Sequence, residues 1–202
     1  MSLTQSRRRR IVWLAVVFEA SLLLVAQVAG WLLGVSPLAS LEVRVEAAAV
    51  GLLATLPPLG LMLLLAGSPW EPFRRLMREL DENLLPLFRN STPLELALIA
   101  LAAGLGEEAL FRGAIQVGLG QMATPVVGLV VASALFGLAH FITRTYAVLA
   151  GLIGLYLGVL FLLLDNLLVP IVVHATYDFV ALSLWLHARE PLDEESVDPD
   201  GD

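Results

Sequence analysis

The sequence predicts an all-α membrane protein, a multi-pass transmembrane bundle of about six helices with one interfacial amphipathic helix. Hydrophobic residues make up 58% of the 202-residue chain, and its mean hydropathy of +0.82 lies well above that of soluble domains. No segment shows the alternation of a membrane β-barrel strand. Apolar runs of about 20 residues, enough to cross a bilayer, occur at 11–34, 46–67, 93–118, 124–142, 146–164 and 167–188.

Charge and composition divide the chain into three predicted regions. Residues 1–92 form an N-terminal two-helix membrane region that includes the interfacial helix, and residues 93–188 form a helical core. Seven of the nineteen acidic residues lie in 190–202, and the other twelve balance the twelve arginines. The net charge of −7 therefore belongs to residues 190–202. We expect the tail, 189–202, to be disordered. We expect no nucleic-acid partner.

The interfacial helix is predicted between the second and third apolar runs. Four apolar residues recur there at helical spacing among charged ones: Phe73, Leu76, Met77 and Leu80. Such a pattern is typical of a helix that lies in the membrane interface. We expect it to cover the edge of the bundle.

Arginines predict the orientation of the bundle. The first run follows Arg7 to Arg10, is too long for a signal-peptide core and lacks a small-residue cleavage site, so it should remain as an anchor. More arginines lie between the second and third runs, at Arg74, Arg75, Arg78 and Arg89. The positive-inside rule places both segments in the cytoplasm, and six spans then place both termini there. The use of arginine alone as the basic residue, with abundant Leu and Ala, indicates a bacterial plasma (inner) membrane.

Prolines and glycines interrupt several of these runs. Pro57 and Pro58 in the second run and Pro170 in the last predict kinked or broken helices. Small residues recur around the third and fifth runs, at Gly104, Gly106, Gly113, Gly151, Gly154 and Gly158. Close helix packing explains them without a further function.

Three ionisable residues stand within the third apolar run: Glu107, Glu108 and Arg112. Charged groups at membrane depth cost several kcal/mol unless paired or hydrated, so they usually mark a functional site. On a helix, Glu108 and Arg112 share a face, whereas Glu107 points about 100° away from Glu108. Glu108 is therefore expected to be neutralised, and Glu107 needs a partner from elsewhere.

Histidines are the best candidates for that partner. His140 closes the fourth run, and His174 lies in the last run with Asp178 one turn later on the same face. His187, at the end of the last run, is expected to be interfacial only. These residues favour a reaction in which a glutamate and a histidine act together on a water molecule.

Other hydrolytic chemistries find less support in the sequence. The chain has no cysteine, which excludes thiolate catalysis and disulfides. Neither His140 nor His174 begins a His-Glu-x-x-His motif, and Ser133 lacks the flanking glycines of a serine nucleophile.

The ordered set of polar residues resembles the CAAX prenyl protease and bacteriocin-processing (Abi) family of intramembrane proteases. The resemblance rests on Glu-Glu-x-x-x-Arg, then Phe-x-x-x-His, then His-x-x-x-Asn/Asp, found at Glu107, Glu108, Arg112, Phe136, His140, His174 and Asp178. It covers residues 93–185 and implies that 93–188 is an Abi-type catalytic core.

The resemblance implies a role for each residue. Glu107 would be the general base that activates water, with His140 assisting it, and His174 with the residue at 178 would stabilise the oxyanion. The structural residues would be Glu108, Arg112 and Phe136. Eukaryotic prenyl-protein proteases typically have Asn at the last position, and an ionised Asp178 can only accept hydrogen bonds. We therefore expect Asp178 to orient His174 or to stay protonated, and we do not carry over a prenylated substrate.

The function expected is that of an intramembrane endopeptidase. A glutamate-activated water would cleave a membrane-associated peptide or protein C-terminal segment, without a cofactor, and the partners would be the lipid bilayer and this substrate. One alternative is a zinc-dependent protease with Zn²⁺ bound by Glu107, His140 and His174. The other is a non-catalytic scaffold, an immunity protein or a proton-coupled transporter that uses the same residues.

Overall fold

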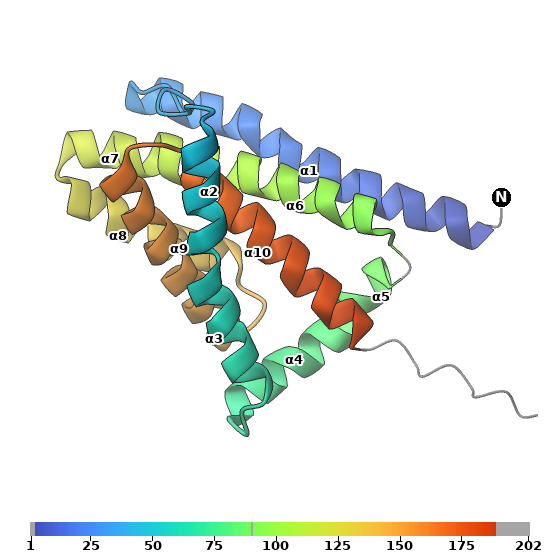
Figure 1. The fold of residues 1–202 in the computed structure, drawn as a ribbon. Helices are drawn as coiled ribbons and strands as arrows, with labels where there is room; N and C mark the ends of the chain where they lie inside the picture. The colour runs from blue at the N-terminus through green and yellow to red at the C-terminus, as the bar shows by residue number, and fades with distance from the viewer. Residues whose placement is uncertain (1–2, 90, 189–202) are drawn as a thin grey trace, which may run out of the picture.

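The computed structural model describes residues 3–89 and 91–188, and every regular element in these ranges is a helix (Figure 1). The elements are α1 (Leu3–Leu33), α2 (Val45–Ala54), α3 (Leu56–Ala66), α4 (Glu71–Asn83), α5 (Leu85–Phe88), α6 (Pro93–Glu108), the π-helix η1 (Ala109–Gln116), α7 (Val117–Met122), α8 (Pro125–Ala139), α9 (Arg144–Leu164) and α10 (Leu168–His187). The predicted all-α class is confirmed. The predicted acidic tail, 189–202, lies outside the described residues.

The six predicted apolar runs correspond to six helical stretches. Four of these are long and apolar enough to cross a membrane: Arg9–Leu33, Val45–Ala66, Arg144–Leu164 and Leu168–His187. Helix α8 is shorter, and the stretch from α6 through α7 carries the buried charges. This hydropathy is that of an integral membrane protein.

The helices form one bundle around α10. Helices α6 and α2 pack against α10, α1 packs along α6 and η1, and α8 pairs with α9. Figure 1 shows α10 crossing the middle of the molecule, and α4 lying across the end where α3 and α10 finish. The N-terminal regions therefore cover the core that carries the sequence motifs.

Threonines begin three of the helices that follow the interfacial region, namely α6, α8 and α9. The hydroxyls of Thr92, Thr124 and Thr143 each accept a hydrogen bond from the backbone N–H three residues later, at 3.1–3.2 Å. Glu95 returns a bond to the Thr92 N–H at 2.8 Å and completes a capping box. These caps satisfy N–H groups that the helices themselves leave unpaired.

Two proline predictions have different outcomes. The second run does break before Pro57 and Pro58, at Thr55, whose hydroxyl donates to a carbonyl one turn earlier at 2.9 Å. The kink predicted at Pro170 is wrong, because α10 begins at Leu168. Pro170 lies in the first helical turn, where its missing N–H has no intrahelical partner to lose.

Helix α4 is amphipathic, as predicted, and its apolar side faces the bundle. Phe73 and Leu76 are 7% and 2% exposed. The Nε1–H of Trp185, near the end of α10, donates to the Asp81 carboxylate at 2.8 Å. Helix α4 is thus fastened across one end of the bundle.

The predicted orientation is testable because the chain has no cysteine of its own. Arg75 on α4 and Ala123 between α7 and α8 are both exposed. Figure 1 shows α4 and the turn between α7 and α8 at opposite ends of the bundle. A membrane-impermeant maleimide should label the Arg75→Cys variant only from the cytoplasmic side, and the Ala123→Cys variant only from the other side. The reverse pattern would contradict the orientation.

Candidate active site

The polar residues of the three motif elements meet where α6, η1, α8 and α10 pack together. Small residues allow this approach: a Cβ added at Gly104 would lie 3.0 Å from the Ile171 carbonyl oxygen of α10. The last residues of α6, Glu107 and Glu108, are 8% and 0% exposed. Close packing at Gly104 therefore brings both carboxylates up to α10.

Glu108 is the most connected carboxylate of the site. Arg112 donates from Nη1 to Glu108 Oε1 at 3.3 Å, and its Nε lies 3.2 Å from Oε2. The Nδ1 atom of His174 lies 2.8 Å from the same Oε1. All three side chains are buried, so Glu108 joins its own helix to α10 through charged groups away from water.

The segment that carries Arg112 is π-helical rather than α-helical, which the sequence does not predict. It spans Ala109–Gln116. Arg112 Nη2 donates to the Gly154 carbonyl at 2.6 Å, and Gln116 Nε2 donates to the Gly158 carbonyl at 3.0 Å. Both residues thus attach η1 to α9. Sequence reasoning missed Gln116, although a glutamine one helical turn after Arg112 in an apolar run is a visible signal.

Glu107 faces a different partner. Its Oε2 lies 3.6 Å from His140 Nε2 and accepts no hydrogen bond from the described residues. His140 Nδ1 lies 2.8 Å from the Phe136 carbonyl oxygen, which can only accept, so Nδ1 carries the hydrogen. Nε2 is therefore the atom turned towards Glu107. A separation above 3.5 Å is too long for a direct hydrogen bond, and a water to the side of the line between the two atoms can contact both.

Phe136 contacts the partners of both glutamates: His140, which faces Glu107, and His174 and Arg112, which pair with Glu108. Its ring stacks on His140 with centroids 4.5 Å apart and meets the His174 ring edge-on at 5.8 Å. The guanidinium carbon of Arg112 lies 4.7 Å from the Phe136 centroid, within cation–π distance. One aromatic side chain thus sets the position of both histidines.

His174 is held at both ring nitrogens. Nδ1 faces Glu108, and Nε2 lies 3.3 Å from the Asp178 carboxylate, one turn along α10. Carboxylates accept hydrogen bonds, so the doubly protonated imidazolium satisfies both contacts at once. Asp178 therefore contacts the ring nitrogen of His174 that Glu108 does not contact.

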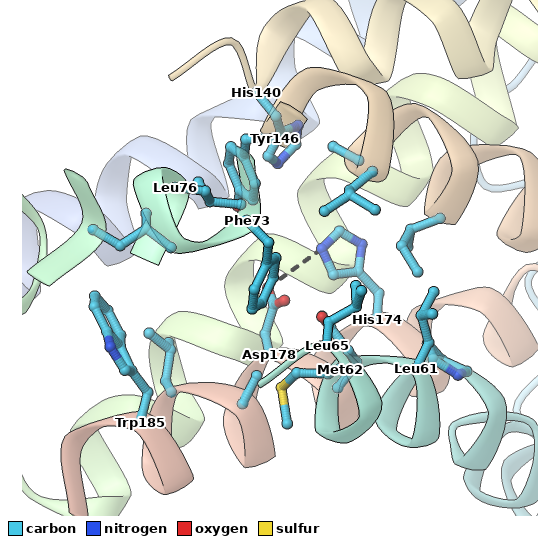
Figure 2. Close-up of a pocket in the computed structure, with 18 of the residues that line it drawn as sticks. Leu61, Met62, Leu65, Phe73, Leu76, His140, Tyr146, His174, Asp178 and Trp185 are labelled. Carbon is cyan, nitrogen blue, oxygen red and sulfur yellow. Dashed lines mark ion pairs between the residues drawn. The ribbon is translucent and has the colours of Figure 1, made fainter. Parts of the chain in front are cut away.

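A cavity of about 230 Å³ opens beside these residues (Figure 2). His140, His174 and Asp178 line it, whereas Glu107 does not and lies beyond His140. The other walls are mostly apolar and come from α3, α4, α9 and α10, among them Leu61, Met62, Leu65, Phe73, Leu76, Tyr146 and Trp185. An apolar cavity with a few converging polar groups is typical of a binding site.

Two other candidates lie apart from this chemistry. The Ser133 hydroxyl donates to the Leu129 carbonyl of its own helix at 2.7 Å. His187 is exposed at the end of α10. Both positions agree with the secondary roles expected for them.

The residues considered for zinc do not form a ligand cluster. Within the described part of the chain, no group of three or more His, Asp or Glu side chains is arranged to hold a metal ion. His174 faces a carboxylate with each ring nitrogen. Neither nitrogen is therefore turned towards Glu107 and His140.

A fourth carboxylate near the site was missed by sequence reasoning. Glu19, on α1, interacts electrostatically with His174, Asp178 and Glu107. It is an acidic residue within the long apolar run of α1. The rule applied to Glu107, that ionisable groups at membrane depth mark function, should have singled it out.

The site holds buried glutamate and histidine side chains beside an apolar cavity, in a helical bundle with the hydropathy of an integral membrane protein. Residues 89–180 match the family model described as type II CAAX prenyl endopeptidase Rce1-like. The resemblance drawn from the motifs is confirmed over this segment, and the matched family is one of endopeptidases. No curated protein and no solved structure matches the chain significantly.

Because Glu108 is buried and paired, its removal should cost much more stability than the removal of an exposed carboxylate. The Glu108→Ala variant leaves Arg112 buried without its carboxylate and should lose about 3–5 kcal/mol of stability. In the control, Glu71→Ala, the lost partners are the exposed Arg74 and Arg78 of α4, and stability should not change measurably. Thermal unfolding of the purified variants measures both. Equal stability of the two variants would contradict the structural role of Glu108.

Proposed function

We propose that the protein is an intramembrane endopeptidase in which Glu107 activates a water molecule to cleave a membrane-associated peptide or protein C-terminal segment. The observation that carries this proposal is the Glu107 Oε2 atom, which is buried, accepts no hydrogen bond from the described residues and faces His140 Nε2 at 3.6 Å. Both atoms can contact one water that lies to the side of the line between them. Glu108, by contrast, forms ion pairs with Arg112 and His174.

The reaction follows from these positions. Glu107 takes a proton from the water while the water oxygen attacks the carbonyl carbon of the peptide bond. His140 holds the water in place through Nε2. When the C–N bond breaks, the proton on Glu107 passes to the leaving amine, so the products are a carboxylic acid and an amine.

The oxyanion formed in between needs a hydrogen-bond donor. His174 Nε2 faces Asp178, which lines the cavity together with His174, and this 3.3 Å contact is longer than the 2.8 Å contact of Nδ1 with Glu108. The Nε2–H group can therefore turn to an oxyanion while Glu108 keeps hold of the ring. A donor fixed in this way before the reaction is worth several kcal/mol in the transition state.

The cavity supports a substrate that is largely apolar. Its walls are mostly aliphatic and aromatic, and α4 covers one side of it at the end of the bundle (Figure 2). A membrane-embedded or lipid-modified chain end would bury apolar surface there.

The Glu107→Gln variant tests the proposal directly. It keeps the shape and burial of the side chain but cannot accept the proton, so cleavage should fall by on the order of 10²–10⁴-fold. The measurement is a proteomic comparison of membrane peptides between cells with wild-type and variant protein. Glu46→Gln, which removes an exposed carboxylate on α2, is the matched control and should behave as wild type. If no peptide depends on Glu107, a scaffold, immunity or transport role replaces the protease.

We further propose that catalysis needs no metal, which the arrangement of His174 between two carboxylates supports. Exhaustive chelation of the purified protein should leave the cleavage rate unchanged. A rate that falls with chelation and returns with added Zn²⁺ would favour the zinc mechanism.

A further inference from the structure

A carboxylate from outside the family match lies next to the proposed active site. Glu19 lies in α1, within the apolar span Arg9–Leu33, whereas the family match begins at residue 89. Its Oε2 atom is buried and accepts no hydrogen bond from the described residues. A buried carboxylate oxygen without such bonds is costly, so its position calls for an explanation beyond packing.

Helix packing brings Glu19 to the residue that precedes Glu107. A Cβ added at Gly106 would collide with the Glu19 carbonyl oxygen and would lie 3.2 Å from the Cβ of Leu22. Helices α1 and α6 therefore touch at Gly106, where only a glycine leaves room. This contact fixes Glu19 relative to the proposed base.

The charges around His174 show what Glu19 adds. Glu108 and Asp178 contact the two ring nitrogens, and Glu19 and Glu107 interact with the same ring electrostatically. Arg112 is paired with Glu108. A further negative charge attracts an imidazolium on His174 and repels a second negative charge on Glu107.

We propose that Glu19 is a positioning residue of the active site, which the contact of α1 with Gly106 holds beside the glutamate pair and which acts through His174 and Glu107. It does not line the cavity, so it acts on these two side chains and not on the substrate. The catalytic part of this inference rests on the proposed function. The electrostatic part does not.

Nitrogen NMR of the histidine rings tests the electrostatic part without any substrate. The chain has three histidines, so full-length protein labelled with ¹⁵N-histidine gives few signals, and the His174→Gln variant assigns those of His174. At one fixed pH, the Glu19→Gln variant should move the His174 signals towards the neutral imidazole. Glu46→Gln is the matched control and should leave them in place. Unchanged His174 signals in a folded Glu19→Gln variant would overturn the proposal.

Kinetics test the catalytic part, with a peptide whose cleavage depends on Glu107 as the probe. The Glu19→Gln variant should lower kcat by on the order of tenfold and leave KM unchanged, since a charge several ångströms away acts on the barrier. Glu19→Asp, which keeps the charge, should restore most of kcat. Equal losses in both variants, or a change in KM alone, would indicate a structural role and overturn it. If no peptide depends on Glu107, the proposed function fails and the NMR result still decides the role of Glu19.

Discussion

Glu108 places a negative charge among membrane-spanning helices where water does not reach it, and its two partners determine how the site is built. Arg112 neutralises the charge, and His174 donates to it from another helix. Each of these groups would be costly to bury alone. Helices α6 and α10 are therefore joined at one point, and Arg112 carries the connection on to α9 through the Gly154 carbonyl.

This network separates the adjacent glutamates. Glu108 uses its carboxylate to hold helices together, whereas Glu107 keeps an oxygen that faces His140 across 3.6 Å. Phe136 contacts both histidines, His140 beside Glu107 and His174 beside Glu108. Structural stability and proposed chemistry thus depend on neighbouring residues that point to different sides of one helix, and a substitution at one need not act like a substitution at the other.

The helices and the two adjacent glutamates could be predicted from the sequence because they depend on local properties of the chain. Apolar run lengths predict the helices, and the cost of burying a charge singles out Glu107 and Glu108. The π-helix could not be predicted, since a change of hydrogen-bond register depends on contacts with α9, among them the Gln116 bond to Gly158. The approach of Glu19 to the site depends on how α1 packs against Gly106, which no local pattern encodes.

The central claim is that Glu107 acts on a water and not directly on the substrate. A single turnover in H₂¹⁸O, followed by mass spectrometry of the products and of the enzyme peptide that contains Glu107, tests it most directly. Our account predicts one ¹⁸O atom in the new carboxyl group of the cleaved substrate and none in Glu107. An ¹⁸O atom in Glu107 with an unlabelled first product would show a covalent intermediate and contradict the account.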